Sequence, residues 1–245
     1  MFYAIQWVRS IAFIGLMYLA MAILGLAFAP FAVFSRAAAY RAIHTYCAWV
    51  RWSARVIAGL RSEIRGTVPS GEVLVASKHQ SFFDIILLAS ILPEPKFIMK
   101  SSLRYAPILG QFGKRIGCVA VNRGRKAEAI QQMIQGVMDP TAPKGQLIIY
   151  PQGTRVAPGA DRPYKVGIYA LYDETGQTVV PAATNVGVFW PRHGIYRKPG
   201  LAVIEFLEPI SPGLDRIEFM QRLEHDVESA SNRLMKDAGF ALPNR

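Results

Sequence analysis

The stretch Val73–Asp84 reads VLVASKHQSFFD and joins a short apolar run to a polar turn. The run predicts a buried strand over Glu72–Ser77, and a helix is expected to follow over Phe82–Ile91. In open α/β sheets, functional groups gather just beyond the carboxyl ends of the strands. His79 occupies such a position, two residues after the expected strand.

Asp84 lies five residues after His79, where the helix is expected to begin. A carboxylate there is able to turn back onto the imidazole, fix its tautomer and leave the other ring nitrogen free to accept a proton. Such a pair forms a general base worth about 10²–10⁴ in rate. The alternative is structural, with His79 a hydrogen-bonded buried group and Asp84 the N-cap of the helix. The spacing alone leaves both interpretations open.

The rest of the chain alternates short apolar runs with longer segments, which is typical of a layered α/β domain. Further strands are expected over Lys96–Met99, Val119–Asn122, Gln146–Tyr150, Val179–Val186 and Ala202–Leu207. Helices are expected over Leu103–Arg115, Arg125–Met138 and Tyr164–Asp173, with a final amphipathic helix over Leu214–Ala238.

A second polar turn, YPQGTR over Tyr150–Arg155, also follows an apolar strand. Gly153 lets the backbone approach a ligand, Thr154 offers a hydroxyl group, and Arg155 is suited to bidentate contact with phosphate. The alternative is a plain turn with one exposed arginine.

The net charge of +11 is unevenly distributed. Residues 1–126 contain 16 Lys and Arg against 4 Asp and Glu, whereas residues 127–245 contain 12 and 13. The stretch from Lys96 to Lys126 has no acidic residue and eight basic ones: Lys96, Lys100, Arg104, Lys114, Arg115, Arg123, Arg125 and Lys126. Solvated basic faces usually include some acids, so this stretch favours a phosphate-rich partner.

Ile11–Phe34 is a run of 24 residues without a charge, of which 21 are hydrophobic. As a helix it would be about 36 Å long, enough to cross or deeply enter a bilayer. A signal peptide is disfavoured because the run is long and Pro30 follows its small-residue site. Arginines follow the run, which favours a cytoplasmic location for the rest of the chain. We expect membrane-anchoring helices over residues 1–65 and an α/β domain over residues 66–245.

Several enzyme classes have no support in the sequence. The chain has no GxSxG, Walker or GxGxxG motif, which leaves serine hydrolases, P-loop NTPases and dinucleotide enzymes without a signature. The two cysteines, Cys47 and Cys118, form neither a disulfide framework nor a CxxC metal site. No metal or cofactor is expected.

In order along the chain, these motifs resemble the blocks of the glycerophospholipid acyltransferase family, in particular its bacterial 1-acyl-glycerol-3-phosphate acyltransferases. The His-x4-Asp block is matched by His79 and Asp84, and the Pro-Glu-Gly-Thr-Arg block by Pro151–Arg155. Between them, Lys100 and the stretch Gly117–Arg123 are similar to the intervening blocks, and Val180-Pro181 to the fourth. Gln152 departs from the pattern, because the family usually has Glu there.

The resemblance implies a mixed central sheet flanked by helices, preceded by a hydrophobic and an amphipathic helix. It implies acyl transfer from an acyl carrier protein or coenzyme A thioester to the sn-2 hydroxyl of lysophosphatidic acid, without an acyl-enzyme. His79 and Asp84 would form the general base, and Lys100 would stabilise the thioester oxygen. The substrate-binding group would be Arg123, Gln152, Gly153, Thr154 and Arg155.

The implied location is the cytoplasmic face of the cell membrane, with membrane phospholipid as a partner and no nucleic acid. One alternative is an acyltransferase for another lysolipid, such as lyso-ornithine lipid, with Gln152 as the reason. A second alternative is a non-catalytic membrane tether that binds anionic lipid or nucleic acid through the basic half of the chain, in which His79 and Asp84 would be dispensable.

Overall fold

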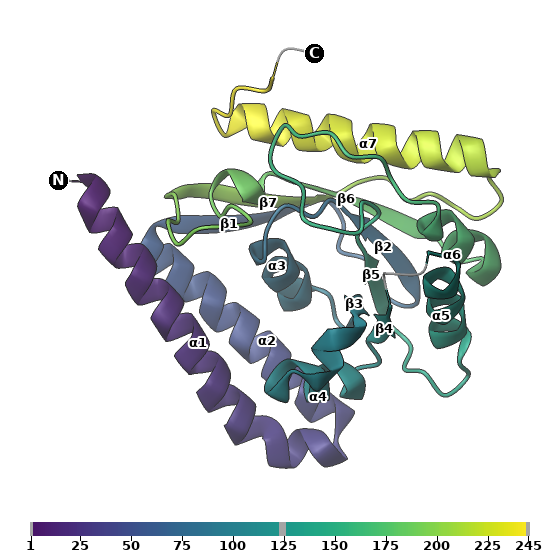
Figure 1. Ribbon diagram of the computed structural model, residues 1–245, viewed down its shortest axis with the longest axis horizontal. Coiled ribbons are helices and arrows are strands. Elements are labelled where there is room, and N and C mark those ends of the chain that lie inside the picture. Colours follow the sequence, from purple (N-terminus) through teal and green to yellow (C-terminus); the bar gives the residue numbers. More distant parts are fainter. Residues whose placement is uncertain (1, 123–125, 244–245) are drawn as a thin grey trace.

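The computed structural model describes residues 2–122 and 126–243. Within this part of the chain, seven strands form one sheet in the order β1-β7-β6-β2-β5-β3-β4 (Figure 1). The strands are β1 (Leu60–Arg65), β2 (Val73–Ser77), β3 (Pro95–Lys100), β4 (Val119–Val121), β5 (Gln146–Ile149), β6 (Val179–Thr184) and β7 (Gly200–Phe206). Neighbouring strands are parallel except β6 and β7, which are antiparallel, so the sheet is mixed as expected.

Helices cover both faces of the sheet (Figure 1). They are α1 (Phe2–Phe34), α2 (Arg36–Ser53), α3 (Phe83–Ile91), α4 (Pro107–Arg115), α5 (Lys126–Met138), α6 (Gly167–Thr175) and α7 (Arg216–Asp237). Short helical turns are η1 (Ala54–Ala58), η2 (Ser101–Tyr105) and η3 (Val186–Val188).

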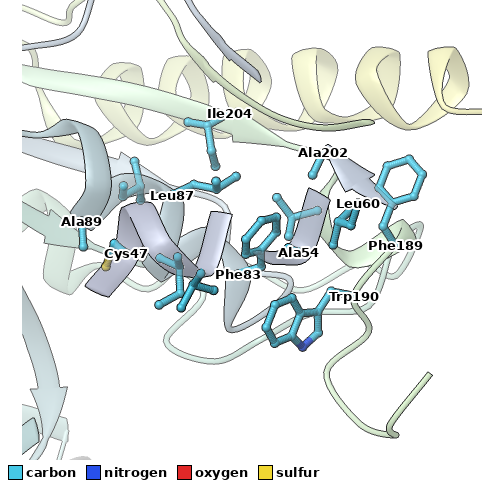
Figure 2. Close-up of a cluster of buried hydrophobic side chains, with 14 of the residues drawn as sticks. Cys47, Ala54, Leu60, Phe83, Leu87, Ala89, Phe189, Trp190, Ala202 and Ile204 are labelled. Carbon is cyan, nitrogen blue, oxygen red and sulfur yellow. The ribbon is translucent and has the colours of Figure 1, made fainter. Parts of the chain in front are cut away.

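Alternating side chains of the central strands divide the core in two, because successive residues of a strand point to opposite faces. Leu74 and Ala76 of β2 belong to the cluster that contains apolar residues of α6 and α7. Val75, between them, belongs to the cluster formed with α2 and α3. Figure 2 shows the second cluster, in which Phe83 of α3 stacks on Trp190 with the ring centroids 5.1 Å apart.

The N-terminal helices α1 and α2 form an antiparallel hairpin beside this second cluster (Figure 1). Ser35 joins them, and its Oγ accepts the N–H of Ala38 at the start of α2. One face of α1 packs on the protein, with Phe13 and Met17 buried, while its other face exposes many large apolar side chains. Among the described residues, Tyr3–Phe34 is long and apolar enough to cross a membrane by length and composition.

The end of the expected helical segment differs from the prediction. Helical structure ends at Ala58, and Leu60–Arg65 instead form β1, which pairs in parallel with β7. Gly59 adopts a φ of +70°, a left-handed conformation that favours glycine and turns the chain into the strand. The expected helix over Leu103–Arg115 is also divided, with η2 first and α4 starting at Pro107.

Candidate active site

The candidate site lies at the carboxyl edge of the parallel strands. Ser77, the last residue of β2, pairs with Ala182 of β6, and Ala76 pairs with Ile149, the last residue of β5. The residues that directly follow β2 and β5 therefore lie side by side. This register brings the turn that contains His79 next to the turn that begins at Tyr150, as expected for an α/β sheet.

His79 and Asp84 form a hydrogen-bonded pair. The imidazole Nδ1 lies 2.9 Å from Oδ1 of Asp84, which lies in the first turn of α3. The Asp84 side chain is fully buried, whereas 13% of the His79 side chain is exposed. With Nδ1–H donating to the carboxylate, the neutral ring presents Nε2 as an acceptor.

The second carboxylate oxygen of Asp84 closes the preceding turn. Oδ2 accepts the backbone N–H groups of Gln80 at 2.8 Å and Ser81 at 2.7 Å. The N-cap of α3 is Phe82, so Asp84 does not cap the helix as the structural alternative supposed. One of its oxygens orders the backbone before the helix, while the other meets His79. These bonds hold the carboxylate in a single orientation and thus orient the imidazole.

Tyr150 completes the surroundings of the pair. Its ring stacks on His79 with the centroids 3.9 Å apart, and its hydroxyl donates to Oδ1 of Asp84 at 3.3 Å. Burial and the Asp84 carboxylate raise the pKa of Tyr150 well above its usual value, so the phenol remains a donor. Tyr150 was included in the second polar turn predicted from the sequence, but no role was predicted for its side chain, although its place directly after β5 was a usable signal.

A backbone hydrogen bond joins the turn after β5 to the turn that contains His79, and a second one closes the turn after β5 itself. The N–H of Val156 donates to the carbonyl of His79 at 2.7 Å, and the N–H of Gly153 donates to the carbonyl of Tyr150 at 2.8 Å. Gly153 has a φ of +69°, which a residue with a side chain rarely adopts. The backbone conformation of this turn therefore favours glycine at position 153.

Thr154 and Arg155 follow on the same turn, and both are half-buried. Arg155 donates from Nη1 to the carbonyl of Arg192 at 3.4 Å, and Arg192 donates to the carbonyl of Arg155 at 3.1 Å. Arg155 and Arg192 are therefore linked to each other beside the turn, each through the other's backbone carbonyl. Sequence reasoning did not select Arg192, which is far from Arg155 along the chain.

Gln152 was grouped with the substrate-binding residues, but its side chain turns into the protein. The residue is 1% exposed. Its Nε2 lies 3.2 Å from the carbonyl oxygen of Arg162 and 3.4 Å from Oε1 of Glu228 on α7. In this structure Gln152 therefore makes internal contacts beneath the turn.

Lys100 is the exposed last residue of β3 and pairs with Val121 at the end of β4. It thus lies at the same edge of the sheet as His79, although no hydrogen bond or ion pair joins the two among the described residues. Arg123, the expected partner in phosphate binding, lies outside the described residues.

The basic stretch is less uniform than its sequence indicated. Lys96 is 7% exposed and donates from Nζ to the carbonyl of Pro143 at 2.6 Å, so it supports the fold and is not part of a basic face. Lys100, Arg104 and Lys114 are exposed, and Arg115 is half-buried. The side chains of Arg123, Arg125 and Lys126 are outside the described part.

A cavity of about 1410 Å³ lies between α1, α4 and the β4 end of the sheet. Apolar residues of α1, including Leu26 and Ala29, form one wall, while Arg104 and Arg115 contribute charge. Ser101 and Asn122, which directly follow β3 and β4, also line the cavity, so it extends to the edge of the sheet where Lys100 lies. His79 is not among its lining residues.

The chain is similar in sequence to several proteins of known name. Over 162 residues the chain is 32% identical to a Pseudomonas aeruginosa protein named 1-acyl-sn-glycerol-3-phosphate acyltransferase, covering 64% of this chain and 62% of that one. A Saccharomyces cerevisiae protein of the same name is 29% identical over 143 residues, covering 56% of this chain and 47% of that one. The matches thus span about half to three fifths of these relatives.

A solved structure has the same fold over nearly the whole chain. The 1-acyl-sn-glycerophosphate acyltransferase PlsC from Thermotoga maritima superposes with a TM-score of 0.79 at 17% identity, covering 96% of this chain and 99% of that one. The family model described as Acyltransferase matches residues 60–185, from the first residue of β1 to the residue after β6. This match includes more than half of the chain and both polar turns of the site. The chain therefore belongs to the acyltransferase family.

Proposed function

We propose that this protein transfers a fatty acyl group from an acyl thioester to the sn-2 hydroxyl of 1-acyl-glycerol-3-phosphate, giving phosphatidic acid. The observation that carries the proposal is the His79–Asp84 pair at the edge of the sheet, in which Nδ1 of the imidazole meets the carboxylate and Nε2 has no hydrogen-bond partner among the described residues. The names of the Pseudomonas and yeast relatives support the same substrate class.

In the proposed reaction, Nε2 of His79 accepts the proton of the acceptor hydroxyl while that oxygen attacks the thioester carbonyl carbon. The C–O bond forms, the C–S bond breaks, and the proton on His79 passes to the departing thiolate. Asp84 stabilises the imidazolium that exists between these two transfers. The acyl group moves directly between substrates, and the chain contributes no covalent intermediate.

Two groups of cations are suited to the charged parts of the substrates. Arg155 and Arg192 lie together beside the turn that contains Gly153 and Thr154, which suits the phosphate of the acceptor. Arg123 is proposed for the same phosphate on the strength of the family resemblance. Lys100 is proposed to stabilise negative charge on the thioester oxygen during attack.

The acyl donor is an acyl carrier protein or coenzyme A thioester, and both carry phosphate. The exposed Lys100, Arg104 and Lys114 lie at or near the β3–α4 side of the site and favour such a donor electrostatically. The cavity beside α1 has one apolar wall, formed by residues of α1, and this wall suits an acyl chain. The buried Gln152 gives no support to a different acceptor headgroup, because it makes internal contacts.

The protein is proposed to bind the cytoplasmic face of the cell membrane through α1. Near one end of α1, Gln6 donates to the carbonyls of Ala58 and Arg197, and near the other end Ala32 packs with Tyr40. A helix held to the protein along its length is suited to lie in the membrane interface with its exposed apolar face towards lipid.

Turnover of purified protein with lysophosphatidic acid and acyl-ACP or acyl-CoA tests the proposal. Wild type should form phosphatidic acid, and His79→Ala should lower kcat by about 10²–10⁴-fold, the usual contribution of a general base. Wild-type turnover by His79→Ala contradicts the mechanism. Equal turnover of an acceptor without phosphate, such as lyso-ornithine lipid, contradicts the assigned acceptor.

A further inference from the structure

A buried ionic cluster lies behind the candidate site, on the face of the sheet that α7 covers. Lys78, the residue before His79, has a side chain only 1% exposed, and its Nζ pairs with Oε2 of Glu228. A buried ammonium without a partner is strongly destabilising, so Lys78 depends on this carboxylate. Glu228 thereby connects α7 to the chain segment that carries His79.

The other oxygen of Glu228 contacts the phosphate-binding turn and the segment that follows it. Oε1 accepts the hydroxyl of Tyr164 at 3.1 Å and lies 3.4 Å from Nε2 of Gln152. Burial and Glu228 raise the pKa of Tyr164 far above its usual value, which keeps its hydroxyl protonated. One carboxylate therefore contacts both sequence motifs of the site from behind.

The residue at position 152 determines whether the cluster contains one carboxylate or two, because its side chain lies beside Glu228. The family resemblance predicts Glu at 152, but a carboxylate there would lie beside that of Glu228, and two carboxylates at such a distance repel each other. With Gln152, Glu228 provides the negative charge opposite Lys78. The amide at 152 and the acid at 228 thus form a complementary pair.

We propose that Glu228 is a positioning residue for acyl transfer, which holds the Lys78–His79 segment and the Gln152–Arg155 turn in a fixed relation and supplies from α7 the carboxylate that position 152 lacks. This inference rests on the proposed function. The general base belongs to one of these segments and the phosphate-binding groups to the other. A displacement of about 1 Å between such groups costs on the order of 10² in rate.

The first test is Glu228→Gln, which keeps the size of the side chain and removes its charge. At a temperature where circular dichroism shows the variant folded, kcat/KM for the lysolipid should fall by about 10²-fold. Asp226→Asn is the matched control, since it removes a carboxylate on the same helix whose partly exposed ion pair is with Arg222. It should stay near wild type. A folded Glu228→Gln protein with wild-type kcat and KM overturns the inference.

The second test moves the charge between the two positions. Gln152→Glu alone places two acids side by side and should lower activity. The double variant Gln152→Glu/Glu228→Gln restores a single carboxylate and should be more active than either single variant. A double variant no better than the poorer single variant overturns the inference, because a residue that acts only through local stability would show additive losses.

The third test separates positioning from stability. Replacing a buried ion pair by apolar residues often preserves stability, so Lys78→Met/Glu228→Leu should unfold at a temperature near that of wild type. Its kcat should nevertheless be low, and full turnover would contradict a positioning role. An inactive wild type in the same assay contradicts the proposed function and this inference with it, whereas an active wild type matched by Glu228→Gln contradicts this inference alone.

Discussion

The imidazole of His79 stacks on the ring of Tyr150, with their centroids 3.9 Å apart and their planes at 17°. The same tyrosine donates its hydroxyl to Oδ1 of Asp84, the oxygen that meets Nδ1 of His79. Tyr150 therefore restricts the ring from one face and the carboxylate from one side. The stacked ring and the hydroxyl of Tyr150 are two separate means of orienting His79, and substitutions at position 150 distinguish their effects on kcat.

Tyr150→Phe keeps the stacked ring and removes the hydroxyl. We expect kcat to fall about 3–10-fold, because a single hydrogen bond contributes about 0.5–1.5 kcal/mol. Tyr150→Leu removes the stack as well and should cost more. Steady-state kinetics at saturating acceptor measure both, and equal kcat for wild type and Tyr150→Leu would exclude a role for the ring.

Asp84→Asn should have a larger effect than either tyrosine variant. The amide no longer fixes the imidazole tautomer or stabilises its cation, and the equivalent change in a Ser-His-Asp triad lowers kcat by about 10⁴-fold. Because Oδ2 also accepts two backbone N–H groups, the thermal midpoint must be measured with kcat. A folded Asp84→Asn protein that retains more than a tenth of wild-type kcat would contradict the general-base assignment.

Arg155→Gln tests the proposed phosphate site. Arg155 is half-buried and held beside Arg192, so loss of its charge should raise KM for lysophosphatidic acid more than it lowers kcat. A charged hydrogen bond contributes about 1.5–3 kcal/mol, which corresponds to roughly 10–150-fold in KM. His193→Gln is a suitable control, because His193 is exposed in the segment that contains Arg192 and has no proposed role in phosphate binding. Equal KM values for the two variants would remove Arg155 from the acceptor site.

Cys47 gives a prediction about pH. Burial raises the pKa of its thiol to about 12, so at pH 8 the folded protein should react with iodoacetamide much more slowly than the unfolded chain. Since the folded pKa is raised, this group's contribution to stability is present below its usual pKa near 8.5 and is lost as the pH rises towards 12. Mass spectrometry of a Cys118→Ser protein, with and without urea, measures the reaction. Equal labelling rates would contradict the buried environment.

The parts of the fold that were predicted from the sequence are mostly local. His79 and Asp84 are five residues apart, so their pairing depends on one turn and the start of one helix. The apolar runs of β2 and β5 predict buried strands because both faces of the sheet are covered. These features were predictable because they depend on residues close together in the sequence.

The features that sequence reasoning missed depend on distant segments. Leu60–Arg65 contains three charged residues and lacks the apolar run that predicts a buried strand. It forms a strand because it pairs with β7, about 140 residues later in the chain. Lys78 and Glu228 are separated by 150 residues, so nothing near Lys78 in the sequence indicates its partner. The orientation of Gln152 likewise follows from the position of α7. Pairing across such separations is decided by the packing of the whole domain.

The exposed face of α1 gives the last prediction, which concerns the membrane. Leu26 is 71% exposed on this face and Phe34 is 85% exposed at its end. Burial of such a side chain in lipid contributes about 1.5–3 kcal/mol, so Leu26→Glu/Phe34→Glu should weaken binding to vesicles by at least about 100-fold. Ile217→Glu is the control, because Ile217 is 65% exposed on α7, across the sheet from the α1–α2 hairpin (Figure 1). Flotation with vesicles that contain anionic lipid measures the binding. If the α1 variant binds as well as the Ile217 variant, α1 is not the membrane contact.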